Sequence, residues 1–312
     1  MIASTEITQN RVSTRRQADL ALVLVCLIWG ITFVVVKRAL GEISTMFFLT
    51  VRFALASVCL LLMFLPRLRA AGEGVVWSGL KGGMAAGVFL WLGYALQTSG
   101  LRYTTAGKSG FLTGFYIVLV PVFGAMLFRK RPQLLDVAGI LVASFGIALI
   151  TLPSLHEKFR MNRGDLLTIG CAVAYALHLL VLGHYSQRER VEPVALGQLG
   201  CTALLSVLAL PFDPPKVVWS TAVLVAIIFT AVFATAVAFA LQTWAQKHTT
   251  TSRTALIFAL EPVFALLAAI ILGGERLNGA GIFGCALVLA GILAVELKPG
   301  QIAAHPNTSR PN

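Results

Sequence analysis

The chain has 312 residues, of which 57% are hydrophobic and 12% are charged, and its mean hydropathy is +0.84. Soluble domains carry about 25% charged residues, so these values exclude a soluble enzyme or binding module. The net charge of +12 would suggest a nucleic-acid partner if the protein were soluble. Here the cations lie in short segments between apolar runs, where membrane orientation and anionic lipid headgroups explain them. We therefore expect membrane lipids, and no nucleic acid, as partners.

Ten apolar segments follow one another along the chain, each about 17–25 residues long, which is the length that a helix needs to cross the hydrocarbon layer. They lie near residues 20–36, 44–65, 77–100, 106–128, 134–152, 165–183, 194–211, 219–244, 254–272 and 280–296. None shows the alternating polarity, over about ten residues, that is typical of a transmembrane barrel. The sequence predicts an all-α integral membrane protein with ten transmembrane helices.

Lysine and arginine are distributed unequally between the two sides of these spans. Assigning the loops alternately places fifteen of the 25 Lys and Arg residues on the side of the N-terminus and nine on the other. The remaining cation, Arg52, lies inside a span. Because cytoplasmic loops carry the excess of positive charge, we expect a multi-pass protein of the cytoplasmic (inner) membrane with both termini in the cytoplasm.

The second half of the chain repeats the first. AlaLeuGlnThr at 95–98 recurs at 240–243, and ProValPhe at 121–123 recurs at 262–264. Each half holds five spans, which is an odd number, so the second half enters the membrane from the opposite side. The sequence therefore predicts two inverted five-helix repeats, as in many secondary carriers.

The repeats divide the chain into five parts. Asp19 matches Asp165 at the start of the first span of each repeat. The first span passes straight into Lys37 without a small-residue cleavage pattern, so it is expected to be an anchor and not a secretory signal. The five parts are a cytoplasmic N-terminal tail (1–19), the first repeat (20–152), a connecting loop (153–164), the second repeat (165–297) and a polar C-terminal tail (298–312).

Pro121 and Pro262 lie at matching places in the fourth span of each repeat. A proline inside a spanning helix removes a backbone donor and clashes with the preceding turn. The freed carbonyl groups are tolerated where they face protein or a watery cavity. A break that recurs in both repeats predicts a substrate path at the repeat interface.

Four short motifs stand in a characteristic order: LeuIleTrpGlyIleThrPhe at 27–33, LeuThrValArgPheAlaLeu at 49–55, LeuGluProValPhe at 260–264 and GlyGlyGluArg at 273–276. With the five-plus-five layout, they resemble an EamA-type member of the drug/metabolite transporter (DMT) superfamily over residues 18–297. The resemblance implies a ten-helix, inverted-repeat carrier for small organic solutes, often an exporter of amino acids or other metabolites. The first half departs at 129–131, where such repeats often have a glutamate, so no role is transferred there.

Glu261 is the only carboxylate well inside a predicted span, and it immediately precedes Pro262. A buried ionisable group in a membrane is a functional candidate, here for proton transfer or for binding a cationic substrate group. The alternative is a structural role in capping backbone donors around the proline. The family's GluPro pair occurs across diverse substrates, which favours the structural role.

Arg52 would cost about 2.5–3.5 kcal/mol at mid-span, so it needs a partner or a route to a headgroup. Its repeat equivalent is Gln198, and a polar residue at both positions indicates that they face inward. Arg52 also lies within three turns of the start of its span. Snorkelling or pairing at the helix end is therefore at least as well supported as substrate binding.

Lys108 and Arg253 also correspond, each just after a ThrThr pair at the start of a span. The helix dipole disfavours cations there, so capping does not explain them. They are candidates for gating an anionic group from opposite faces, and interfacial anchoring is the favoured alternative. In addition, Gly79, Gly83 and Gly87 on span three and Gly110 and Gly114 on span four have the spacing that lets helices approach closely.

Matched glutamines and aromatic residues on several spans are candidates for lining a substrate cavity. Glutamine supplies donors and an acceptor, and rings supply apolar and cation–π contact, which suits an amphipathic metabolite. His178 is either a proton relay or a hydrogen-bonded packing residue. The candidates are Trp29, Trp91, Tyr94, Gln97, Tyr116, Tyr175, His178, Gln242 and Trp244.

Sequence signals for an enzyme fail on inspection. GlyLysSer at 107–109 is no phosphate loop, because the required upstream glycine falls at Arg102. HExxH and GxSxG motifs are missing, and the five cysteines lie within spans without CxxC spacing. We expect no enzyme activity, no metal and no cofactor.

The sequence thus predicts a secondary transporter that moves a small organic metabolite by alternating access, with export preferred on the resemblance. A monomer can suffice, and proton coupling through Glu261 or His178 and uncoupled facilitation both stay open. One alternative is a multidrug exporter of organic cations, but the small multidrug-resistance branch carries a first-helix glutamate and residues 20–36 hold no acid. A receptor or assembly subunit that does not transport is the alternative of another class.

Overall fold

The computed structural model describes residues 2–104, 106–128, 134–151, 161–273 and 279–296. Within these ranges the chain forms helices and no strand, apart from an isolated β-bridge between Ile43 and Val217. The all-α fold class is confirmed. The polar C-terminal tail and most of the connecting loop lie outside the described residues.

Every predicted apolar segment falls on one helix or on consecutive helices of the structure. The first half holds α1 (Ile2–Ala39), α2 (Thr45–Arg69), α3 (Glu73–Leu101), α4 (Ala106–Gly114), α5 (Tyr116–Phe128) and α6 (Leu134–Thr151). The second half holds α7 (Arg163–Ser186), α8 (Val191–Leu208), α9 (Thr221–Ala231), α10 (Ala238–His248), α11 (Thr251–Ile257), α12 (Glu261–Gly273) and α13 (Gly279–Glu296). A π-helical turn, Val232–Val237, joins α9 to α10, and a 3-10 turn, Phe258–Leu260, joins α11 to α12.

Six helical stretches in the described part are long and apolar enough to cross a membrane: Ser13–Ala39, Thr45–Arg69, Glu73–Leu101, Arg163–Ser186, Val191–Leu208 and Thr221–His248. Three shorter apolar helices accompany them, at Leu112–Leu127, Val137–Leu149 and Gly279–Ala294. The chain is therefore a multi-pass membrane protein.

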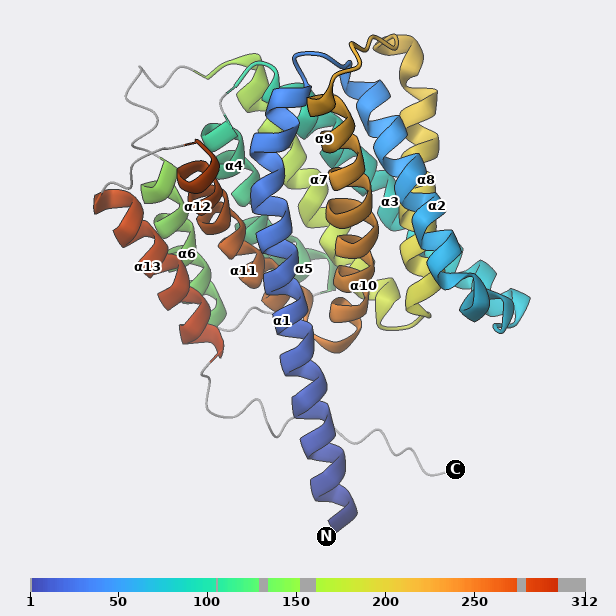
Figure 1. The fold of residues 1–312 in the computed structure, drawn as a ribbon. Helices are drawn as coiled ribbons and strands as arrows, with labels where there is room; N and C mark the ends of the chain where they lie inside the picture. Colours follow the sequence, from blue (N-terminus) through green and yellow to red (C-terminus); the bar gives the residue numbers. More distant parts are fainter. Residues whose placement is uncertain (1, 105, 129–133, 152–160, 274–278, 297–312) are drawn as a thin grey trace.

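The helices form one bundle in which α6 and α13 lie together on one side and α2, α3 and α8 on the other (Figure 1). Two apolar clusters make up most of its core, one around Ile117 and Phe258 and the other around Phe53 and Phe239. Trp29 on α1 and Tyr175 on α7 contact both clusters. The middle of the bundle is therefore the place where the two halves of the core meet.

The first helix begins earlier than the sequence predicts. The predicted N-terminal tail continues as helix from Ile2, and its end projects beyond the bundle (Figure 1). Residues 2–19 contain no glycine or proline to interrupt a helix. We call the end of the bundle from which this extension projects the N-terminal face.

The glycines of α3 allow close contact with α8, as their spacing predicts. A Cβ atom on Gly79 would lie 2.5 Å from Cγ of Pro193, and one on Gly83 would overlap the carbonyl oxygen of Val194. The prediction is wrong for Gly110, because a Cβ there would meet nothing within 4 Å. Spacing by four permits close approach only on the helix face that has a neighbour.

We predict that Gly83→Ala destabilises the protein, because its Cβ would push α3 away from the backbone of α8. Overpacking of this kind costs about 1–3 kcal/mol. Gly200→Ala on α8 is the matched control, since a Cβ there meets nothing within 4 Å and alanine favours a helix over glycine. Thermal unfolding in detergent measures both, and equal melting temperatures for the two variants would contradict the close contact.

The fourth span is interrupted in both halves. In the second half the interruption is the 3-10 turn before Glu261, and Pro262 follows directly. In the first half helix α4 ends at Gly114 and α5 begins at Tyr116, whereas Pro121 lies inside α5. The prediction that Pro121 marks the break is therefore wrong by several residues. The lost hydrogen bond is tolerated because Pro121 is buried against other helices.

Candidate functional site, a cavity between the two halves

A cavity of about 70 Å³, measured as the space open to the centre of a water molecule, lies in the middle of the bundle. That volume has room for several waters or a small solute. Its lining comes from both halves of the chain: Trp29, Thr32, Phe33, Val36, Arg52, Leu90, Tyr94, Gln97, Thr98, Leu101, Thr113, Tyr116, Tyr175, His178, Leu179, Phe239, Gln242, Phe258 and Glu261. The α1 residues among them begin at Trp29, so the cavity extends away from the N-terminal face.

Helical periodicity explains which side chains reach the cavity. On α3 the lining residues Leu90, Tyr94 and Leu101 recur at the spacing of one helix face. Trp91 follows Leu90 by one position and is rotated by about 100° from it, and it is not part of the lining. Trp244 is likewise outside the lining and its ring contacts His248. The other seven predicted cavity residues line it, together with Arg52 and Glu261.

A polar chain joins the two halves across the cavity. The hydroxyl of Tyr175 donates to Oε1 of Gln97 at 3.2 Å, and Nε2 of Gln97 donates to Oγ1 of Thr113 at 3.1 Å. The ring of Tyr175 meets those of Tyr94 and Tyr116 edge-on, with centroids 5.6 and 6.4 Å apart. The wall therefore combines aromatic faces with fixed hydrogen-bonding groups.

Arg52 is only 3% exposed and lies on the cavity wall. Its Nε donates to Oγ1 of Thr235 at 2.7 Å, and its Nη2 donates to the hydroxyl of Tyr94 at 3.2 Å. The guanidinium carbon also lies 4.7 Å from the centroid of the Tyr94 ring. The snorkelling alternative is wrong, because the side chain turns inward to these partners and is closed off from the surface.

The π-helical turn Val232–Val237 supplies partners that sequence reasoning missed. The carbonyl oxygen of Ala234 accepts from Nε1 of Trp29 at 2.9 Å and from Nη2 of Arg52 at 3.5 Å. A π turn shifts the backbone hydrogen bonds and leaves carbonyl groups for other donors, often at functional sites. Its sequence, ValPheAlaThrAlaVal, holds no glycine or proline that would have marked it.

His178 is held by a buried polar group on α8. Its Nε2 lies 2.9 Å from Oε1 of Gln198, whose Nε2 donates to Oγ1 of Thr243 at 2.9 Å. Gln198 is buried but is not part of the cavity lining. The repeat equivalents Arg52 and Gln198 thus differ in role, because only Arg52 reaches the cavity.

Glu261 begins α12 directly after the 3-10 turn and is half-buried on the cavity wall. Within the described ranges, no hydrogen bond or ion pair involves its carboxylate. The capping alternative therefore has no side-chain hydrogen bond to support it here.

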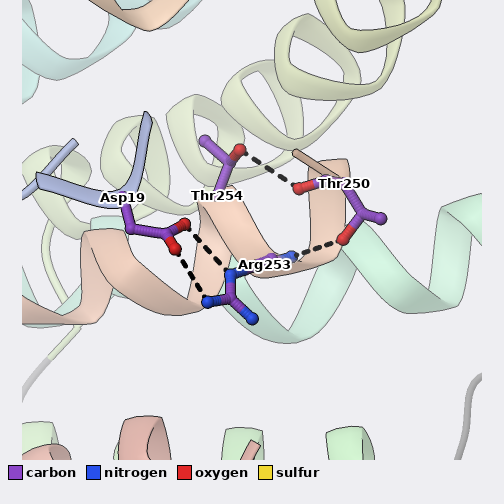
Figure 2. A network of polar contacts seen from close by, with 4 residues as sticks. All are labelled: Asp19, Thr250, Arg253 and Thr254. Carbon is purple, nitrogen blue, oxygen red and sulfur yellow. Dashed lines mark hydrogen bonds and ion pairs between the residues drawn. The ribbon is translucent and has the colours of Figure 1, made fainter. Parts of the chain in front are cut away.

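Arg253 joins α11 to α1 near the N-terminal face (Figure 2). Its Nε and Nη2 donate to Oδ1 and Oδ2 of Asp19 at 3.0 and 2.8 Å, and the two side chains are 9% and 18% exposed. The backbone N–H of Arg253 donates to Oγ1 of Thr250 at 3.3 Å. Interfacial anchoring is wrong for Arg253, because its charge is paired inside the bundle. The side chain of Lys108, its repeat equivalent, lies outside the described residues.

The repeat equivalent of Asp19 occupies the same kind of place in the other half. Oγ1 of Thr104 donates to Oδ1 of Asp165 at 2.9 Å, and Asp165 also forms a capping box with Asn162 at the start of α7. Sequence reasoning used the two aspartates only to align the repeats. An acid at the same position in both halves was the signal that would have found these contacts.

Residues 16–152 and 162–297 both match the sequence profile of one family, described as the EamA-like transporter family. The chain belongs to the EamA-like transporter family. This confirms the resemblance given by the four short motifs, and the two matched stretches agree with the predicted duplication.

Relatives of this EamA-like chain cover nearly its whole length. An uncharacterized transporter of Archaeoglobus fulgidus is 37% identical and aligns over 91% of this chain and 87% of its own. Proteins named probable amino-acid metabolite efflux pumps, from Salmonella typhimurium and Escherichia coli, are 24% and 25% identical, each over 89% of this chain and 94% of their own. A chain of known crystal structure shares the fold, with a TM-score of 0.75, 21% identity and coverage of 90% and 97%.

Proposed function

We propose that this EamA-like chain is a secondary transporter that moves a small organic metabolite, an amino acid or related compound, across the cytoplasmic (inner) membrane, with export preferred. The observation that carries this proposal is a cavity, lined by both halves of the chain, that holds one arginine and one glutamate among aromatic rings. A monomer suffices, because one chain supplies the whole lining. Both termini lie in the cytoplasm in this proposal.

Reciprocal glycine contacts between α6 and α13 support the ten-helix architecture of two inverted repeats. A Cβ on Gly146 would lie 2.6 Å from the carbonyl oxygen of Gly284, and one on Gly291 would lie 2.5 Å from that of Gly139. Gly139 precedes Gly284, and Gly146 precedes Gly291, by the same 145 positions as the AlaLeuGlnThr repeat. Such self-complementary contacts are expected between two copies related by a pseudo-two-fold axis.

Alternating access is supported by the polar contacts at the two ends of the bundle. The Asp19–Arg253 pair closes α11 against α1 at the N-terminal face, while the cavity extends toward the opposite face. Asp165 contacts the segment before α4 at that opposite face. In the proposed cycle, the contacts at one end open as those at the other end close.

The class of solute rests on the cavity and on the names of relatives. The two efflux pumps are named for amino-acid metabolites, and the cavity volume of about 70 Å³ suits a small solute. A multidrug exporter of organic cations is disfavoured, because a solute without an anionic group would leave the buried charge of Arg52 without a partner. A receptor without transport is disfavoured by buried charges on a cavity between two repeats.

Counterflow in liposomes tests the proposal. The purified full-length protein is reconstituted and supplied with pooled radiolabelled amino acids, nucleosides or organic cations, with protein-free liposomes as the control. We expect saturable exchange with the amino-acid pool. Exchange of organic cations alone would favour the multidrug alternative. If folded protein exchanges no solute from any pool, the transporter proposal is overturned.

A further inference from the structure

The charge of Arg52 has no counter-charge among the residues that the structure describes. No carboxylate in the described part of the chain forms an ion pair with it, and its partners are two hydroxyl groups and one carbonyl. Nη1 has no hydrogen-bond partner among the described residues. A buried, unpaired charge is costly in a protein. The guanidinium can therefore pair favourably with an anionic group that enters the cavity.

Glu261 and Gln242 place a carboxylate and an amide oxygen on the same cavity wall, where they can accept hydrogen bonds. The carboxylate of Glu261 makes no ion pair with Arg52 or with any other described residue, although both side chains line the cavity. Oε1 of Gln242 is buried and has no hydrogen-bond donor among the described residues. These acceptors suit a group that brings several N–H donors and a positive charge, as an ammonium does.

Resting on the proposed function, we propose that Arg52 binds the carboxylate of a zwitterionic amino acid and that Glu261 and Gln242 receive its ammonium group. A hydrogen bond between a guanidinium and a carboxylate is charge-assisted, so it is shorter and stronger than one between neutral groups. Thr235 and Tyr94 hold the guanidinium in place and leave Nη1 to the substrate. Arg52 is thus the residue that distinguishes amino acids from the amines derived from them.

In this proposal, an aromatic part of the wall contacts the substrate side chain. Trp29 packs edge-on against Phe258 and at a tilt against Phe239, with ring centroids 5.0 and 5.4 Å apart, and all three line the cavity. Such a wall offers apolar contact but no further charge. The cavity therefore fits amino acids with uncharged, apolar side chains.

The test compares amino acids with their analogues in counterflow. The probes are L-leucine and L-phenylalanine, their decarboxylated amines and their methyl esters, added against the radiolabelled amino-acid pool. For the wild-type protein, we expect each amino acid to compete about tenfold or more better than its amine or ester, because the charge-assisted hydrogen bonds to Arg52 are lost. In Arg52→Gln this preference is expected to disappear. In Arg52→Lys it is expected to be intermediate, because the charge remains but the planar guanidinium that Thr235 and Tyr94 hold in place is lost.

The outcomes separate this inference from the transporter proposal. An unchanged preference in folded Arg52→Gln, or wild-type exchange limited to amines, nucleosides or organic cations, overturns the inference and leaves transport standing. If the wild-type protein exchanges no solute from any pool, both this inference and the transporter proposal are overturned. If Arg52→Gln does not fold, Thr235→Val serves instead, because it removes the 2.7 Å anchor of Nε but keeps the charge. A reduced preference for amino acids is then expected, and an unchanged one overturns the inference.

Discussion

Replacing Arg253 by alanine is expected to open the N-terminal face of the transporter. The substitution leaves the carboxylate of Asp19 without its bidentate partner at a site where only 18% of that side chain is exposed. Breaking a fully buried pair costs about 3–5 kcal/mol, and partial exposure reduces this to about 1–3 kcal/mol. A change of that size shifts a conformational equilibrium by about five- to more than a hundredfold.

Labelling of a cysteine in the cavity measures this shift. Thr113→Cys is introduced after the five native cysteines are replaced, and a membrane-impermeant maleimide is applied from each side. We expect labelling from the N-terminal side to rise in Arg253→Ala and to return toward the parent level in the charge exchange Asp19→Arg with Arg253→Asp. Arg67→Ala is the control, because Arg67 is 68% exposed and lies 3.7 Å from Glu192. Equal labelling of Arg253→Ala and Arg67→Ala would show that the pair does not close this face.

Replacing Glu261 by glutamine is expected to remove the response of transport to an imposed pH gradient. Glutamine keeps the size of the side chain but can neither ionise nor carry a coupling proton. Glu261 is the carboxylate of the cavity lining. No described residue donates a hydrogen bond to it. Solute exchange without a gradient is expected to persist with an affinity about tenfold weaker, because one charged hydrogen-bond acceptor is lost.

Flux into or out of liposomes, with and without an imposed gradient, gives the readout. His178→Gln is the matched control, since His178 is the other cavity residue considered as a proton carrier, and it already contacts Gln198. We expect His178→Gln to keep the pH response. A normal response in Glu261→Gln would take that residue out of the proton path, and loss of the response only in His178→Gln would transfer the role to the histidine.

Much of the architecture followed from the order of residues alone. Apolar segments of span length predicted the helices, since hydrocarbon leaves a backbone no other way to satisfy its hydrogen bonds. The ProValPhe and AlaLeuGlnThr repeats aligned the two halves. Seven of the nine aromatic and polar cavity candidates line one cavity in the structure, because helical periodicity brings residues three or four positions apart to one face.

The sequence could not decide contacts that depend on how each helix is rotated and how deeply it sits. Trp91 is adjacent to a lining residue and still lies outside the lining, and Arg52 turns inward instead of toward a headgroup. The π-helical turn that supplies Ala234 and Thr235 has no marker in the sequence.

The sequence by itself therefore determined that this protein is a duplicated helical membrane transporter of the EamA type, because apolar length and repeated motifs are properties of the chain. Only the tertiary structure decided that Arg253 pairs with Asp19 and that Arg52 and Glu261 share one cavity. The members of each of these pairs lie more than 200 positions apart along the chain. Arg253 and Asp19 meet because α11 and α1 pack together, and Arg52 and Glu261 share a cavity because helices of both halves surround it. Local sequence patterns do not specify such packing.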